Sequence, residues 1–231
     1  MNVVEIRDLS ILENEKKILN NINISLKGKS IYGIIGSDFS GRKELLKSIA
    51  GIITKYNGSV KVLGSDLKDK DLNILDSLGV AFSDEGFINE YTGFKNLKVI
   101  SSIKGVLDND DITDVFYILN IVDLLDKKFK EYEEDEKKKL LIAQAIMEKP
   151  KVLIIDDPFK NLDEKYISYL INIFYKLTEE RKITVILGLR NNDYIDENIN
   201  IYTIENGFIK EWILGLFTLS INVGRPILNF V

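Results

Sequence analysis

Two adjacent carboxylates follow a short apolar run near the middle of the chain. Asp156 and Asp157 come directly after Val152–Ile155, and Pro150 and Pro158 lie on either side of the segment. A run that short between two prolines predicts a central parallel strand that is buried on both faces. Open α/β sheets bind their ligands at the carboxyl ends of such strands, so the two aspartates are candidate ligand-binding residues.

A glycine-bearing loop gives the second indication of chemistry. Residues 30–52 predict a strand, a loop that carries Gly36 and Gly41, and a helix whose apolar residues recur at helical spacing. Glycines in such a loop let backbone N–H groups converge on a phosphate at the N-terminus of a helix. The segment therefore predicts a phosphate-binding turn.

Composition limits the classes of protein to which the chain can belong. Its 231 residues, 45% of them hydrophobic, suffice for one large domain or for one domain with a subdomain. The absence of cysteine and histidine excludes disulfides, thiolate metal sites and imidazole catalysis. A net charge of −5 argues against a general nucleic-acid binder. We expect no membrane span, since no apolar run approaches about 20 residues, and no signal peptide, since residues 1–8 lack its pattern.

The elements that position these residues follow from the β-branched runs. Runs before residue 66 lie close together, as in a small antiparallel sheet, whereas later runs alternate with helical patterns, as in a parallel sheet with crossover helices. A helical, polar stretch from about 84 to 145 predicts an inserted subdomain. The expected fold is therefore α/β. The expected strands are Val3–Ile6, Ile22–Leu26, Ile31–Ile35, Val60–Leu63, Val80–Phe82, Val152–Ile155, Thr184–Leu187, Ile201–Ile204 and Phe208–Ile213.

Together these segments resemble the ATP-binding cassette (ABC) ATPases, particularly those of bacterial drug and antimicrobial-peptide exporters. Residues 30–52 resemble the Walker A region, 80–97 the Q-loop, 137–150 the helix after the signature turn, and 151–163 the Walker B and D-loop segment. The resemblance covers residues 1 to about 211. It implies a P-loop NTPase-like core with an N-terminal antiparallel β subdomain and a helical subdomain, which binds ATP and Mg²⁺.

The Walker A resemblance implies a set of nucleotide-binding positions in which several residues depart from the family. Arg42 replaces the lysine, and a planar guanidinium is not equivalent to a compact ammonium. Lys43 replaces the serine that binds Mg²⁺, and an ammonium has no lone pair for a metal. Phe39 replaces a glycine, so a positive φ there would carry a steric cost. The implied positions are Gly36, Ser37, Ser40, Gly41, Arg42, Lys43 and Glu44.

Glu44 adds a negative charge where the family has a threonine beside the α-phosphate. A carboxylate suits the positive end of the following helix, so we expect Glu44 to stabilise the empty loop and to disfavour nucleotide. An alternative is a charge-compensated loop, in which Lys43 stands in for Mg²⁺ against Asp156.

The implied catalytic positions are also altered. Asp156 matches the aspartate that coordinates Mg²⁺, but Asp157 lies where the family has a glutamate and is one methylene shorter. Ser83 lies at the Q-loop position and is too short to touch the metal or the attacking water. Arg190 lies at the switch-histidine position and cannot reproduce a neutral imidazole contact. We therefore expect impaired hydrolysis.

The signature turn has become strongly acidic. Glu133, Glu134, Asp135 and Glu136 lie where the family binds the γ-phosphate held by the opposite subunit. Carboxylates there would repel that phosphate. They are equally a solvated acidic turn that caps the basic start of the next helix.

The resemblance implies a head-to-tail pair of cassettes that is cytoplasmic and peripheral, bound to membrane subunits at the inner face of the cell membrane. Because this chain alters its own site and offers an acidic turn to its partner's site, we expect a pseudo-ATPase subunit, docked through the surface around residues 83–95. Its partners would be ABC transporter membrane subunits and a second cassette, with no nucleic acid. Two alternatives are a slow ATPase that still powers export, and a non-transport cassette that holds a protein partner as an immunity or regulatory module.

The chain ends in an unusually apolar segment, residues 212–231. We expect a domain over 1–211 and a separate C-terminal tail. The stretch Trp212–Val223 is too short to span a bilayer, and Gly224 and Pro226 interrupt it. It predicts a last strand or helix packed on the core or on a partner, with an interfacial contact or an altered reading frame as alternatives.

Overall fold

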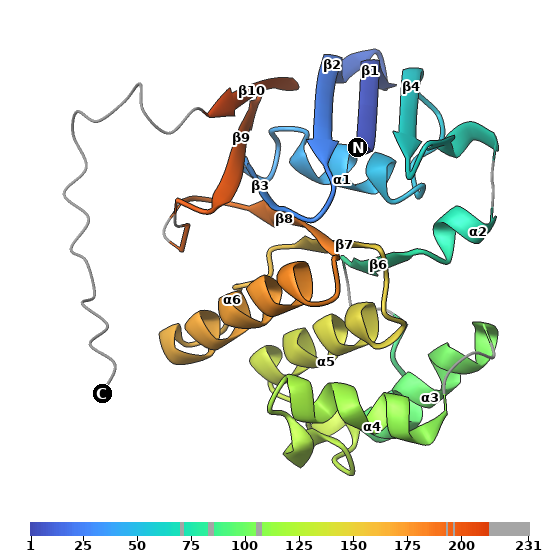
Figure 1. The fold of residues 1–231 in the computed structure, drawn as a ribbon, viewed down its shortest axis with the longest axis vertical. Helices are drawn as coiled ribbons and strands as arrows, with labels where there is room; N and C mark the ends of the chain where they lie inside the picture. The colour runs from blue at the N-terminus through green and yellow to red at the C-terminus, as the bar shows by residue number, and fades with distance from the viewer. Residues whose placement is uncertain (70–71, 83–85, 105–107, 193, 196, 213–231) are drawn as a thin grey trace.

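The protein is built from two β-sheets with helices packed around them (Figure 1). The computed structural model describes residues 1–69, 72–82, 86–104, 108–192, 194–195 and 197–212. The strands predicted from the sequence all correspond to observed strands, and the expected α/β class is confirmed.

The first sheet is antiparallel and has the order β2-β1-β4-β5. β1 and β2 are long strands whose buried residues alternate along much of their length, because one face packs on the core and the other faces solvent. This is the expected N-terminal β subdomain. Its strands are β1 (Asn2–Glu13), β2 (Lys16–Lys27), β4 (Asn57–Val62) and β5 (Ser65–Asp66).

The second sheet has the order β10-β9-β3-β8-β7-β6 and is parallel except for the β9–β10 hairpin. Every residue of β7 and β8 is buried, as expected for central parallel strands covered on both faces. Its strands are β3 (Ile31–Ile35), β6 (Leu78–Ala81), β7 (Val152–Asp156), β8 (Thr184–Leu189), β9 (Ile199–Glu205) and β10 (Phe208–Trp212).

The two faces of this sheet belong to two different cores. Along β7, Val152 and Ile154 pack with the antiparallel sheet and α1, whereas Leu153 and Ile155 pack with α5 and α6. The alternation fixes the register of the strand, because a slip of one residue would exchange the two faces. The α-helices are α1 (Arg42–Ile49), α2 (Leu72–Leu75), α3 (Gly93–Lys104), α4 (Asn109–Ile118), α5 (Glu134–Met147) and α6 (Glu164–Glu179), and the 3₁₀ turns are Leu67–Asp69, Val122–Leu124 and Phe129–Glu131.

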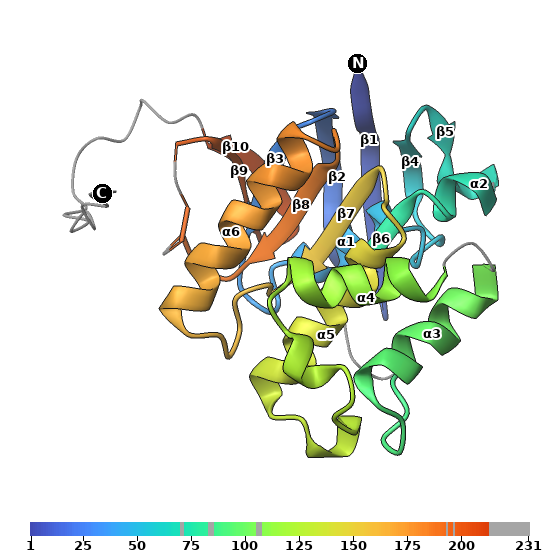
Figure 2. The same cartoon turned by 60° about the horizontal axis from the view of Figure 1, so that its bottom comes forward.

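The helices between β6 and β7 form the region expected to be a helical subdomain. Figure 2 shows α3, α4 and α5 gathered below the parallel sheet, away from the antiparallel sheet, and α4 packs on both α3 and α5. Among the described residues, no helix is long and apolar enough to cross a membrane. The division into a domain over 1–211 and a tail stays a prediction, and 213–231 lie outside the described residues.

Candidate functional site

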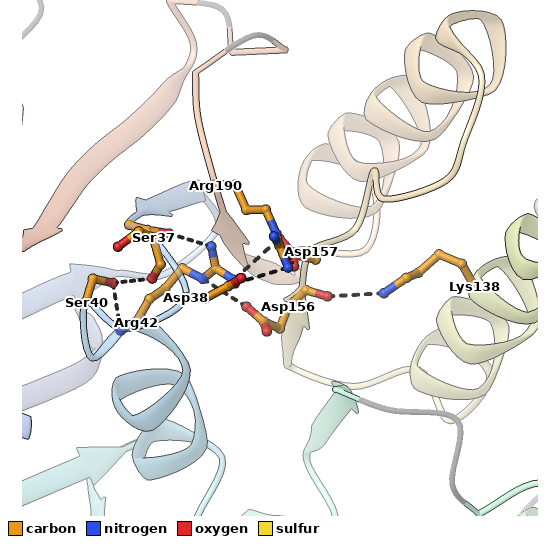
Figure 3. Close-up of polar contacts among 9 residues, drawn as sticks. Ser37, Asp38, Ser40, Arg42, Lys138, Asp156, Asp157 and Arg190 are labelled. Atoms are coloured by element: carbon orange, nitrogen blue, oxygen red, sulfur yellow. Dashed lines mark hydrogen bonds and ion pairs between the residues drawn. The ribbon is translucent and has the colours of Figure 1, made fainter.

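Three segments of the predicted site meet at the carboxyl edge of the parallel sheet. The strands β3, β8 and β7 are neighbours in that order, and all three run parallel. The glycine-bearing loop follows β3, Asp156 and Asp157 lie at the end of β7, and Arg190 follows β8. Side chains from these three strand ends point toward one another in Figure 3.

The loop after β3 is closed by its own hydrogen bonds and needs glycine at Gly36 and Gly41. A Cβ on Gly36 would lie 2.3 Å from Ser40 Oγ. The Ser40 hydroxyl donates to the Ser37 carbonyl at 2.7 Å, and the Arg42 amide donates to Ser40 Oγ at 3.3 Å. Gly41 adopts a φ of 95°, where an added Cβ would lie 2.8 Å from the Ile18 carbonyl oxygen. The loop therefore keeps the outline of a phosphate-binding turn.

Phe39 causes none of the backbone strain that a positive φ would bring. The left-handed turn of the loop falls on Gly41 instead, and Phe39 is not among the residues with positive φ. The residue is 97% exposed. The loop thus accommodates a bulky residue by turning it out to solvent.

Arg42 lies inside the site, and each of its three guanidinium nitrogens contacts an oxygen atom of another residue. Its Nε donates to Asp156 Oδ1 at 3.1 Å, its Nη1 donates to the Gly36 carbonyl at 2.6 Å, and its Nη2 lies 3.4 Å from Asp157 Oδ1. The side chain is only 3% exposed. The guanidinium therefore fills the space between the loop and the end of β7.

Arg190 approaches Asp157 from the opposite side. Its Nε donates to Asp157 Oδ2 at 2.8 Å, and its Nη2 lies 3.1 Å from Asp38 Oδ1. Half of this side chain is exposed. These contacts form a continuous series of ion pairs, Asp38–Arg190–Asp157–Arg42–Asp156, which we call the site network (Figure 3).

The charges of the site network nearly cancel. Two arginines and three aspartates give a formal charge of −1. Burial raises the pKa of Asp156, while the charge of Arg42 opposes that rise. The hydrogen bond to Asp157 and the charge of that carboxylate raise the pKa of Arg190, which stays protonated at any physiological pH. The Lys138 ammonium adds a hydrogen bond to the Asp156 carbonyl oxygen at 3.3 Å.

The ion pairs next to α1 differ from those of the charge-compensated alternative, in which Lys43 faces Asp156. Arg42, and not Lys43, forms the ion pair with Asp156. Lys43 is exposed and acts on Asp156 only as a minor charge that lowers its pKa. Glu44 lies in the first turn of α1, where a carboxylate is favourable, so its stabilising role stays a prediction.

The acidic signature segment begins α5 as a capped and internally paired turn. Glu133 is the N-cap, and its reciprocal hydrogen bonds with Glu136 make a capping box. Glu136 also pairs with Lys127 at 2.6 Å. Glu134 pairs with Lys137 at 2.8 Å and Asp135 with Lys139 at 2.7 Å. The acidic turn that caps a basic helix is thus present as predicted.

Three further features complete the account of the site. The Q-loop position Ser83 lies outside the described residues. Asp38 was missed by sequence reasoning, although an acid inside a glycine-bearing loop is a visible signal. Also missed was a cavity of about 320 Å³ beside Asp157, walled by Arg190, Lys160 and the edge-to-face pair of Phe159 and Tyr194.

Comparisons of the sequence with known proteins identify the family to which the chain is similar. A family model described as ABC transporter matches residues 19–160. An uncharacterised ABC transporter ATP-binding protein of Bacillus subtilis (strain 168), YybJ, is 30% identical over 84% of this chain and 88% of its own length. The bacitracin transport ATP-binding protein BcrA of Enterococcus faecalis is 24% identical over 86% of this chain and 70% of its own length.

Solved structures show the same fold. The dimeric structure of MJ0796, described as a bacterial ABC transporter cassette, superimposes with a TM-score of 0.82 at 19% identity and covers 93% of this chain and 100% of that one. The ADP form of the cassette MJ1267 superimposes with a TM-score of 0.74 at 22% identity, over 91% of this chain and 90% of that one. The predicted cassette architecture is confirmed.

Proposed function

The chain belongs to the ABC transporter family, and we propose that it is a cassette subunit that has lost ATP hydrolysis, a pseudo-ATPase kept for structural or regulatory pairing. At the coarser level it is an ATP-binding-cassette subunit of a bacterial transporter, the role that the names of its relatives give. Its partners are membrane subunits and a second cassette, and its place is peripheral, on the inner face of the membrane.

The observation that carries the proposal is the buried bond between Arg42 and Asp156. A magnesium ion needs carboxylate and phosphate oxygens as ligands. Asp156 Oδ1 already accepts from Arg42 Nε at 3.1 Å, and both side chains are less than a tenth exposed. We infer that these residues do not fit Mg²⁺, because the ion would have to displace a buried guanidinium that already fills the position beside Asp156.

The position of Asp157 supports the same proposal. A catalytic carboxylate must be free to orient the attacking water. Asp157 instead has one carboxylate oxygen directed at Arg42 and the other at Arg190. In our proposal neither Asp157 nor Arg190 performs the role of its family position, and Ser83 lacks the reach for the Q-loop role.

The acidic turn extends the proposal to a partner's site. A cassette that faced this turn would meet three carboxylates that are already paired with lysines, those of Glu134, Asp135 and Glu136. Such a surface offers a nucleotide phosphate no uncompensated positive charge, so the composite site with a partner would also be impaired. We further propose that the cassette domain spans 1–211, with its helical subdomain at about 84–145.

The direct test compares the wild-type chain with a variant whose phosphate loop is restored. Calorimetric titration with ATP, with and without Mg²⁺, is expected to give no binding to the wild type at millimolar nucleotide. The triple variant Arg42→Lys, Lys43→Ser, Glu44→Thr removes the guanidinium and supplies the metal-binding hydroxyl, so it should gain Mg²⁺-dependent binding. Tight Mg²⁺-dependent binding and turnover by the wild type would instead establish a slow ATPase that powers export.

A second measurement separates a transporter subunit from a free-standing module. The tagged chain should be expressed together with the membrane subunit of its own transporter. We expect the two to purify as a complex from detergent extracts. A chain that forms no such complex would favour the immunity or regulatory module, whatever its nucleotide binding.

A further inference from the structure

The Asp157 carboxylate occupies a position between two guanidinium groups, where a bound anion would be expected. We propose that Arg42 and Arg190 form an oxyanion site that Asp157 fills as an internal ligand, so that a tetrahedral oxyanion such as phosphate binds only when this carboxylate is removed. The inference rests on the proposed function, because it names what keeps the nucleotide site closed.

The contacts of Asp157 are those of a bound anion. One oxygen lies 3.4 Å from Arg42 Nη2, and the other accepts from Arg190 Nε at 2.8 Å. Paired arginines are the usual protein donors for phosphate and carboxylate oxygens, since their planar forks present several N–H groups at once. The two arginines thus recognise a side chain of their own protein by the chemistry that would recognise a phosphate.

The backbone holds this internal ligand in place. Asp157 has a φ of 49°, a left-handed conformation that aspartate tolerates better than most residues. Its amide donates to the Gly188 carbonyl at 3.0 Å, which ties it to the neighbouring strand β8. A Cβ on Gly188 would lie 2.4 Å from Asp156 Oδ1 and 3.3 Å from Arg42 Nε. The glycine therefore leaves the room that the arginine and the carboxylates occupy.

The cavity beside Asp157 provides the entrance that an external anion would use. Its volume is about 320 Å³, and Asp157, Arg190 and Lys160 contribute to its wall. Lys160 is exposed and Arg190 is half exposed, so a path of positive charge runs from solvent to Asp157, whose other carboxylate oxygen faces the buried Arg42. The internal carboxylate lies where this path meets the two arginines.

Removal of the internal ligand should therefore create anion binding. The variant Asp157→Ala opens the position, and the probe is inorganic phosphate, titrated into the full-length chain by calorimetry at constant ionic strength. We expect a dissociation constant for phosphate at least about tenfold lower than that of the wild type, from the charged hydrogen bonds regained. Asp114→Ala removes the same charge from the exposed surface of α4 and should leave the affinity at the wild-type value.

The second arginine supplies the decisive control. In Asp157→Ala with Arg190→Gln, the gain in phosphate affinity should disappear. If Asp157→Ala does not fold, Asp157→Asn keeps the side-chain volume and should still bind phosphate more tightly than the wild type. Equal affinities in the wild type and in these variants, or a gain that survives Arg190→Gln, would overturn the proposal. Turnover of Mg²⁺-ATP by the wild type would refute the pseudo-ATPase assignment independently of these titrations.

Discussion

Removing the Arg42 guanidinium should destabilise the fold more than any change at the exposed edge of the site. Arg42→Met keeps an apolar side chain of similar length but takes the cation from Asp156, whose side chain is 8% exposed. Removing one partner of a buried ion pair costs about 3–5 kcal/mol, because the other charge stays buried without compensation. The Gly36 carbonyl and Asp157 each lose a contact as well. We therefore expect Arg42→Met to lower the free energy of unfolding by about 3–5 kcal/mol.

A double-mutant cycle isolates the pair. Urea unfolding at pH 7 would be measured for the wild type, Arg42→Met, Asp156→Asn and the double variant. The double variant should be less destabilised than the sum of the single variants by about 2 kcal/mol, since no ionised Asp156 is then left unpaired. Arg7→Met is the matched control, because this arginine is 77% exposed and should cost about 1 kcal/mol or less.

The same reasoning predicts how the stability of the Arg42→Met variant changes with pH. Burial raises the pKa of Asp156, and Arg42 opposes that rise. Without the arginine the folded-state pKa should rise further above its unfolded value, so ionisation of Asp156 removes stability as the pH rises through the folded pKa. The stability gap between Arg42→Met and Arg42→Met/Asp156→Asn should therefore widen with pH. A coupling near zero, or a gap that does not change with pH, would refute the reasoning.

Three smaller perturbations have expected outcomes by the same unfolding assay. Arg190→Gln should lower the free energy of unfolding by about 1 kcal/mol or less, because solvent screens a half-exposed side chain. A decrease equal to that of Arg42→Met would contradict the view that Arg42, and not Arg190, is the arginine that stabilises the fold. Tyr132→Phe should cost roughly 1–2 kcal/mol, since the buried hydroxyl donates to the Leu124 carbonyl, and an unchanged midpoint would argue against that bond. Gly188→Ala should cost about 1–3 kcal/mol, because its Cβ would lie 2.4 Å from Asp156 Oδ1, and a neutral effect would show that the site network can move aside.

The fold could be predicted from the sequence because its signals are local and periodic. The run Val152–Ile155 alternates between two cores, and its burial on both faces follows from a short apolar segment between prolines. The acidic start of α5 was predictable for the same reason, since a cap and its lysine partners lie within one or two helical turns.

The pairing inside the site could not be predicted in the same way. Arg42 and Asp156 are 114 residues apart, and only the packing of β3 against β8 and β7 brings them together. Sequence reasoning judged Arg42 and Lys43 against the needs of a nucleotide. It therefore assigned the contact with Asp156, in one alternative, to the neighbouring lysine. The reach of a side chain from a helix N-terminus depends on the direction in which the helix presents it, and residue type alone does not give that direction.

The geometry also explains why an arginine suits this position. Three groups surround it: the Gly36 carbonyl, Asp156 and Asp157. A guanidinium has donors on three nitrogens in one plane and can meet all of them, whereas an ammonium is a single point charge. A lysine here would have to meet two carboxylates and the carbonyl from a single nitrogen atom. Arg42 thus joins the loop after β3 to the end of β7 through one buried ion pair, one hydrogen bond to the backbone and a contact with Asp157.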